Sequence, residues 1–207
     1  RVVYLYYLYS GFSIYFAENI DKIGDNMKEV KPHYMSVVPR LLEKVYDKIY
    51  NKGISAGGLK KMIFLWALGV NKNYELGTPK NLKQRIADRL VFSKWREGLG
   101  GNIITLISGS AALSKNLNKK FQAAGIPIIE GYGLTETSPV IAVNSFEKMK
   151  IGSVGQPLDN LDVKIDKDGE ILVKGPSVMK GYYKNPEQTK EAFSEDGLSL
   201  IHISEPT

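Results

Sequence analysis

Apolar residues recur every three to four positions through much of the first half of the chain, a spacing typical of amphipathic helices. The pattern predicts helices over residues 2–9, 20–30, 39–53, 54–70 and 81–97. Pro39 suits the first turn of one helix, and Gly53 suits its end. The last helix is expected to carry one apolar face, made by Leu82, Ile86, Leu90 and Trp95.

Short runs of aliphatic and aromatic residues alternate with these helices and predict buried strands over residues 13–16, 35–38, 103–107 and 126–129. Ser114 is expected to cap a further helix that carries Leu117 and Phe121. Strands that alternate with helices are typical of a parallel sheet joined by right-handed crossovers. The predicted fold class is therefore α/β, a parallel sheet with flanking helices.

The periodicity changes near residue 150, where apolar and polar residues begin to alternate. Leu161, Val163 and Ile165 occupy every second position, and Asp168-Gly169 is a strong hairpin signal before the next alternating run. We therefore divide the chain into an α/β part over 1–148 and a β-rich part over 149–197. Residues 198–207 fit neither pattern, and we expect them to be a non-native tail.

Composition narrows the function classes without choosing one. Hydrophobic residues make up 43% and charged residues 24%, with a net charge of +6. The lysines are scattered rather than clustered, and the sequence has neither zinc-ligand spacing nor a basic block interleaved with aromatic residues, so we expect no nucleic-acid partner. Because the chain has no cysteine, a disulfide scaffold and a cysteine thioester mechanism are excluded.

The first residues need a membrane test, because 2–17 carry no charge. A spanning helix requires about 20 apolar residues, whereas this run is shorter, rich in tyrosine and interrupted by Ser10-Gly11. We expect a cytoplasmic protein in which this segment is buried. Peripheral contact with a lipid surface is left open.

The segment from Gly131 to Thr137, Gly-Tyr-Gly-Leu-Thr-Glu-Thr, carries the strongest chemical signal. Its glycines, Gly131 and Gly133, allow close approach of a ligand, and Tyr132 supplies a ring that can stack on a base. Thr135 supplies a hydroxyl for phosphate, and Glu136 a carboxylate for a divalent cation. We expect the segment to form a turn after the strand at 126–129, and so a nucleotide site at that strand's carboxyl end.

Better-known phosphate loops are excluded by the same residues. A dinucleotide fingerprint requires a third glycine where Glu136 stands, and the Gly-Lys-Ser/Thr ending of a P-loop is absent from the sequence. A carboxylate repels phosphate unless a metal lies between them. The pattern therefore favours stacking of a base combined with a metal-bridged phosphate.

Together with Ser108-Gly109-Ser110-Ala111-Ala112-Leu113, the Tyr-Gly-Leu-Thr-Glu-Thr motif resembles the acyl-adenylate-forming superfamily of AMP-binding enzymes. Downstream, Gly169 to Pro176 and Val178 to Thr189 are similar to another signature of that family, in the expected order. The segments 38–46 and 64–68 are most similar to long-chain fatty acyl-CoA synthetases. The resemblance covers about residues 1–197.

The resemblance implies roles for individual residues. Gly109, Ser110 and Ala111 would face the adenine, and Tyr132 would stack on its other side, within a nucleotide-binding set completed by Gly131, Gly133, Leu134 and Thr135. Thr135 and Glu136 would be the catalytic residues; Thr135 would bind the α-phosphate, and Glu136 would hold Mg²⁺. The family usually has glycine at position 110 and proline at 112, so Ser110 and Ala112 depart from its pattern.

The activity implied is ligation of a long-chain fatty acid to coenzyme A at the expense of ATP, with the fatty acid, ATP and coenzyme A as small-molecule partners. The family's upstream phosphate loop and its ribose-binding aspartate are not found in this sequence. We therefore expect an internal fragment of an incomplete adenylation domain, inactive alone, whose β-rich part belongs to a small β-barrel subdomain. Two alternatives stay open: an adenylating enzyme for another carboxylic acid, and a non-catalytic nucleotide-binding or scaffold protein. Chain-length preference and oligomeric state cannot be read from the sequence.

Overall fold

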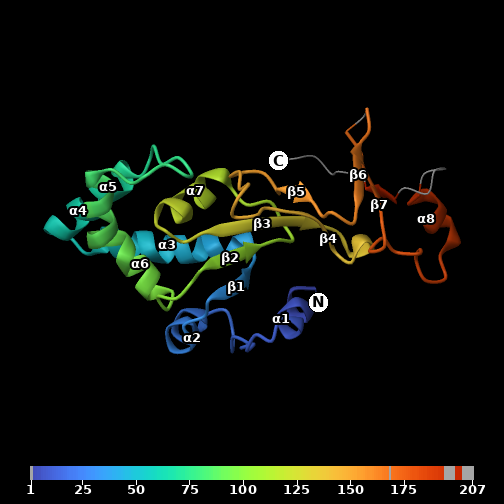
Figure 1. Ribbon diagram of the computed structural model, residues 1–207. Helices are drawn as coiled ribbons and strands as arrows, with labels where there is room; N and C mark the ends of the chain where they lie inside the picture. Colours follow the sequence, from blue (N-terminus) through green and yellow to red (C-terminus); the bar gives the residue numbers. More distant parts are fainter. Residues whose placement is uncertain (1, 168, 194–198, 202–207) are drawn as a thin grey trace.

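The computed structural model describes residues 2–167, 169–193 and 199–201 and shows an elongated molecule (Figure 1). Helices gather at one end, a sheet runs through the middle, and a small β-rich part lies at the other end. Asp168 of the expected hairpin turn lies outside the described residues, as do most of residues 198–207.

The central sheet has five strands in the order β1-β2-β3-β4-β5. Strands β1 (Tyr34–Val37), β2 (Thr105–Ser108) and β3 (Ile128–Gly133) are parallel, as predicted for an α/β fold. Strands β4 (Val140–Val143) and β5 (Gln156–Pro157) extend the sheet in the antiparallel sense, which the sequence did not indicate. The parallel part brings the carboxyl ends of β2 and β3 side by side.

The main hydrophobic core lies between this sheet and the helices that flank it, α3 (Pro39–Ser55), α4 (Gly58–Val70) and α7 (Lys115–Ala123) among them. Pro39 occupies the first turn of α3, as predicted, but the helix continues past Gly53. The predicted helix end at Gly53 is therefore wrong. A Cβ at this position would lie 2.5 Å from the Phe64 ring of α4, so Gly53 instead permits close packing of two helices.

The predicted helix over 81–97 is present as α5 (Leu82–Ala87), a π turn (Asp88–Phe92) and α6 (Ser93–Gly98). Its start is fixed by a capping box, in which Asn81 accepts from the Gln84 N–H and the Gln84 side chain accepts from the Asn81 N–H. The predicted apolar face is wrong except for Trp95, because Leu82, Ile86 and Leu90 are exposed. The face that enters the core is made by Ala87, Val91, Phe92 and Trp95.

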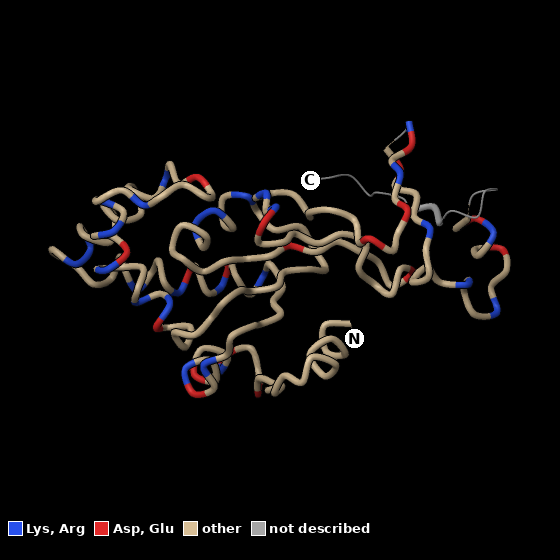
Figure 2. The backbone as a smooth tube through the Cα atoms, viewed as in Figure 1, with Lys and Arg blue, Asp and Glu red and all other residues tan. Residues whose placement is uncertain are grey.

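One ion-pair cluster joins this helical segment to its surroundings. Arg96 donates to both carboxylate oxygens of Asp88, at 2.9 and 3.0 Å, and Lys80 donates to the same carboxylate at 2.7 Å. Arg96 also donates to the Ala124 carbonyl at the end of α7. Elsewhere Lys and Arg are spread over helices and loops, as the scattered lysines of the sequence predict (Figure 2).

The N-terminal segment forms α1 (Val2–Tyr9) and α2 (Ile23–Val30). The predicted strand at 13–16 is wrong, because these residues form no regular element. Nor is the segment buried as expected, since Tyr9, Tyr15 and Phe16 are all exposed. Within the residues that the structure describes, every helix falls short of the length or hydropathy that a bilayer-spanning segment needs.

The C-terminal part forms a second sheet of three antiparallel strands, β6 (Asp162–Ile165), β7 (Ile171–Lys174) and β8 (Ser199–Ile201), with α8 (Pro186–Glu191) beside it (Figure 1). The alternation of Val163 and Ile165 against Ile171 and Val173 is confirmed as the β6–β7 pairing. Strand β8 lies within the segment expected to be a tail, and its residues pair with β7.

Candidate functional site

The two glycine-containing segments meet at the carboxyl-end edge of the sheet, where the neighbouring strands β2 and β3 end. Ser108 at the end of β2 pairs with Glu130 in β3. The segments that follow therefore start as neighbours. A Cβ on Gly109 would lie 3.7 Å from the Gly131 carbonyl oxygen, so the two backbones are in near contact. Residues that are more than twenty positions apart in the sequence are thus brought to one place.

The segment Gly131–Gly133 is not the turn that the sequence analysis expected. It forms the end of β3, where Gly131 pairs with Val143 and Tyr132 with Ala142 of β4. A register shift follows between Tyr132 and Gly133. Strand β4 supplies hydrogen-bond partners that the sequence did not reveal, so the strand runs on through the glycines.

The turn lies further on, in a 3-10 helix over Thr135–Thr137. Thr137 is fully buried and fixes this turn, because its hydroxyl accepts from the Leu134 N–H at 3.1 Å and donates to the Pro139 carbonyl at 2.6 Å. Thr135 is left exposed and Glu136 partly exposed. Both polar side chains are therefore held on a rigid turn at the sheet edge.

Tyr132 is half-buried and packs against a second, smaller hydrophobic cluster of Ile141, Leu161 and Val173. Burial raises the pKa of its phenol. The ring is consequently held by side chains from β4 and from the second sheet. A stacking platform requires such support, because a free tyrosine ring would lose rotamer entropy on binding.

Glu136 is linked to the C-terminal part of the chain by two hydrogen bonds. The Tyr182 hydroxyl donates to Glu136 Oε1 at 2.9 Å, and the Met179 N–H donates to the Glu136 carbonyl at 2.7 Å. The hydrogen bond to Glu136 raises the pKa of Tyr182. Sequence analysis assigned no role to Tyr182, whose partner lies 46 positions away.

The loop after β2 has a strained backbone at one position. Ser110 has φ +70°, in the left-handed region that favours glycine, where the family usually has glycine. Ser110 and Ala111 are both exposed, whereas Leu113 is buried. The loop is therefore anchored at Leu113 and presents its small residues outward.

A divalent cation would find one carboxylate at this site. Within the described residues, no three His, Cys, Asp or Glu side chains gather closely enough to hold a metal by themselves. Mg²⁺ is usually bound by one or two carboxylates together with water and substrate phosphates. The single Glu136 carboxylate, next to the exposed Thr135 hydroxyl, fits an ion of that kind.

Glu130 is a polar residue of this region that sequence analysis missed. It lies in β3, directly before Gly131, and its side chain is 7% exposed. Burial raises the pKa of its carboxyl, although hydrogen bonds from Asn118, Gly152 and Leu113 offset part of that effect. The sequence did show a carboxylate in an otherwise apolar strand. It could not show the role of that carboxylate, because the partners of Glu130 lie on other elements.

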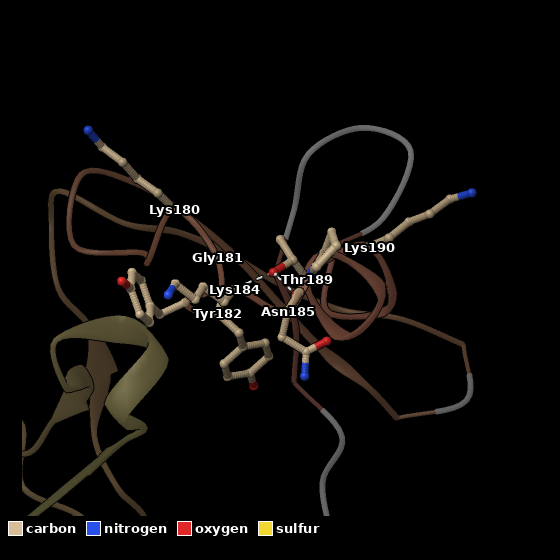
Figure 3. A pocket seen from close by; sticks show the side chains of 9 residues that line it. Lys180, Gly181, Tyr182, Lys184, Asn185, Thr189 and Lys190 are labelled. Atoms are coloured by element: carbon tan, nitrogen blue, oxygen red, sulfur yellow. Dashed lines mark hydrogen bonds between the residues drawn. The ribbon is translucent and has the colours of Figure 1, made fainter.

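A shallow, open surface pocket of about 590 Å³ lies beside the predicted site, lined by residues 180–186, 189 and 190 (Figure 3). Tyr182 lines it and donates its phenol hydrogen to Glu136. Thr189 links two of the lining residues, because its hydroxyl accepts from the Tyr182 N–H at 2.9 Å and donates to the Asn185 carbonyl at 2.7 Å. Lys180 and Lys190 extend outward from the pocket in Figure 3.

Comparison with known proteins identifies the family and the fold of the chain. A family model described as AMP-binding enzyme matches residues 1–183. The long-chain-fatty-acid–CoA ligase FadD15 of Mycobacterium bovis is 36% identical over 202 residues, covering 94% of this chain and 33% of that protein. Long-chain-fatty-acid–CoA ligase 5 of Rattus norvegicus is 35% identical over 195 residues, covering 88% of this chain and 28% of that protein.

Among solved structures, ATP-bound MatB from Rhodopseudomonas palustris matches with a TM-score of 0.64 and 23% identity, over 96% of this chain and 33% of that one. That likeness shows the fold. The chain spans about a third of the length of the relatives that it matches. Because the family model covers most of its residues, the chain belongs to the AMP-binding enzyme family.

Proposed function

We propose that this chain is the nucleotide-binding part of an ATP-dependent long-chain fatty acid–CoA ligase. The observation that carries the proposal is the meeting of the Gly109–Ala111 loop with the Gly131–Thr137 segment at one sheet edge. The choice of a long-chain fatty acid rests on the relatives of 35–36% identity, which bear that name.

The proposed reaction has two steps. A carboxylate oxygen of the fatty acid attacks the α-phosphorus of ATP, the bond to pyrophosphate breaks, and an acyl-adenylate forms. The sulfur of coenzyme A then attacks the acyl carbonyl, gives up its proton, and displaces AMP. Catalysis of the first step is mainly positioning and charge neutralisation, so the chain's task is to hold the nucleotide in line with the carboxylate.

In this proposal the adenine lies between the Tyr132 ring and the Gly109–Ala111 loop. The support for it is the near contact of Gly109 with Gly131, which places the loop against the strand that carries Tyr132. Stacking of a base on an aromatic side chain contributes roughly 1–3 kcal/mol. The exposed small side chains of Ser110 and Ala111 leave room for a flat ring.

Thr135 and Glu136 act at the phosphate end. The Thr135 hydroxyl would donate to an oxygen of the α-phosphate, and the Glu136 carboxylate would hold Mg²⁺. When bound, the ion would neutralise charge between the phosphates and the incoming carboxylate. The support is the turn fixed by Thr137, which holds both side chains beside β3.

Replacement of Glu136 tests this proposal in the full-length protein that carries these residues. Glu136→Gln keeps the size of the side chain but removes its charge. The rate of fatty-acid-dependent ATP–pyrophosphate exchange should fall by about 100-fold or more at saturating Mg²⁺. ATP affinity, measured by calorimetry without Mg²⁺, should change little because the base still stacks.

Glu147→Gln is the matched control, because Glu147 is an exposed carboxylate on the loop after β4. It should leave the exchange rate unchanged. If Glu136→Gln exchanges pyrophosphate as fast as the control, Glu136 has no part in the reaction. Exchange with short or aromatic acids and none with fatty acids would keep the adenylating reaction and reject the proposed substrate.

A further inference from the structure

Glu130 is a buried carboxylate at the point where several segments of the candidate site converge. Its side chain is 7% exposed, although an unpaired charge in a protein interior is strongly unfavourable. Such a group persists where hydrogen bonds satisfy its oxygens. The donors that surround Glu130 therefore indicate what it holds in place.

Its donors come from different elements. The Asn118 Nδ2 amide of α7, itself 2% exposed, donates to Glu130 Oε1 at 2.7 Å. The backbone N–H groups of Leu113 and Gly152 also lie near enough to the carboxylate to lower its pKa. The first of these belongs to the loop after β2 and the second to the loop between β4 and β5. One side chain thus joins a helix and two loops to strand β3.

A second buried polar residue ties the same strand position to the β4–β5 loop. Asn144 is 4% exposed, and its N–H donates to the Glu130 carbonyl at 3.0 Å. Its side chain accepts from the Lys150 N–H at 3.2 Å and donates to the Ser153 carbonyl. The loop that supplies Gly152 is therefore already fixed by Asn144, whereas the 109–113 loop has no such second polar anchor among the hydrogen bonds of the described residues.

The 109–113 loop depends on Glu130 for another reason. Ser114, at the start of α7, makes no side-chain cap, so the predicted cap by Ser114 does not hold the loop. Ser110 has a strained φ of +70°, and Ala111 and Ala112 are exposed. The loop is held near β3 by the hydrogen bond from Asn118 of α7, the helix that directly follows it, to the Glu130 carboxylate, and by the burial of the Leu113 side chain. The Leu113 N–H also lies near that carboxylate.

We propose that Glu130 is a positioning residue for nucleotide binding, whose carboxylate fixes the distance between the 109–113 loop and the strand that carries Tyr132. This inference rests on the proposed function, because it takes the nucleotide to bind between those two segments. A carboxylate accepts from all of its donors, whereas the amide of a glutamine would place an N–H₂ group against one of them. The requirement is thus for an acceptor and not merely for a side chain of that size.

The test uses the full-length protein and ATP as the probe, with affinity measured by calorimetry so that no turnover is needed. Glu130→Gln should weaken ATP binding about tenfold, the effect of losing one hydrogen bond to a charged group. Hydrogen exchange of the amides over 109–113 should become faster. Glu130→Asp, which keeps the acceptor on a shorter stem, should recover part of both properties.

Gln122→Met is the matched control. Gln122 is buried at the same helix–strand interface, but its amide donates to the Ile128 carbonyl and to Met149 Sδ in the β4–β5 loop, and makes no hydrogen bond to the 109–113 loop. It should lower the melting temperature while leaving ATP affinity and exchange over 109–113 unchanged. If Glu130→Gln does not fold, Asn118→Ala can replace it, because it removes one donor to the carboxylate. It should also speed hydrogen exchange over 109–113 and weaken ATP binding, both to a smaller extent.

The outcomes are separable. Faster exchange over 109–113 with unchanged ATP affinity would overturn the inference, as would equal losses of affinity in the Glu130 and Gln122 variants. A wild-type protein that binds ATP but forms no adenylate would refute the proposed function, while the positioning role would still be decided by affinity and exchange. A wild-type protein that does not bind ATP would overturn both.

Discussion

At the residue scale, Gly133 shows how tightly the candidate site is built. It ends strand β3, and a Cβ at this position would lie 1.6 Å from the Pro139 carbonyl oxygen. The obstacle is backbone, which cannot rotate away as a side chain can. The turn that carries Thr135 and Glu136 therefore approaches the strand closely only because position 133 has no side chain.

Gly133→Ala should accordingly lower the free energy of unfolding by about 2 kcal/mol or more, since the backbone must move to admit the methyl group. Urea unfolding of the full-length protein measures the change. Gly69→Ala in α4 is the control, because no atom lies within 4 Å of a Cβ placed there. That change should instead stabilise the protein, by about 0.5–1 kcal/mol. Equal effects of the two substitutions would contradict the close approach.

The residues of the candidate site could be proposed one by one from the sequence, but their arrangement could not. Tyr132, Thr135 and Glu136 stand out because a stacking ring, a hydroxyl and a carboxylate follow one another beside glycines. Glu130 did not stand out, because its role depends on the Leu113 and Gly152 N–H groups. Contacts of that kind are made by the tertiary fold, and no local pattern records them.

At the element scale, the segment from α5 to α6 shows where periodicity fails. A stripe at Leu82, Ile86 and Leu90 follows helical spacing as well as the buried face does, but it is exposed. The buried residues Ala87, Val91 and Trp95 follow the same spacing one position later. Spacing finds a helix but cannot choose between neighbouring apolar faces, because that choice is made by the partner elements. Strand β3 is a similar case, since β4 extends it through the glycines.

The ion-pair cluster of Asp88, Arg96 and Lys80 gives this segment a dependence on pH. Burial raises the pKa of Asp88, but hydrogen bonds from Arg96 and Lys80 outweigh burial and leave that pKa lowered. A carboxylate with a lowered pKa stabilises the fold above its unfolded-state pKa, about 3.9. That contribution is lost as the pH falls through the folded-state pKa.

Asp88→Asn should therefore reduce the free energy of unfolding by about 1–2 kcal/mol at neutral pH. The difference from wild type should stay constant down to about pH 5 and shrink below about pH 4. Asp25→Asn, which removes an exposed partner 3.8 Å from Lys28, is the control and should have almost no effect. A deficit of Asp88→Asn that persists unchanged at acid pH would rule out the ion pairs as its cause.

At the scale of the whole molecule, the candidate site lies where two sheets are joined. The chain spans 33% of the length of a relative such as FadD15 of Mycobacterium bovis. The sheet edge at Gly109 and Gly131, the turn at Glu136 and the second sheet around Val173 are joined by the Tyr132 packing and the Tyr182 hydrogen bond. The α/β class and the later change to β structure were predictable from periodicity. The contact between the two sheets was not predictable, because it is made by single residues that lie far apart in the sequence.

The most direct test of the central claim is a crystal structure of the full-length protein with a nonhydrolysable fatty acyl-adenylate analogue and Mg²⁺. We expect the adenine to lie between the Tyr132 ring and the Gly109–Ala111 loop, the Thr135 hydroxyl to contact the phosphate mimic, and Glu136 to bind the metal. A structure in which the Tyr132 ring and the Glu136 carboxylate face separate cavities, with the analogue bound away from both, would contradict the account.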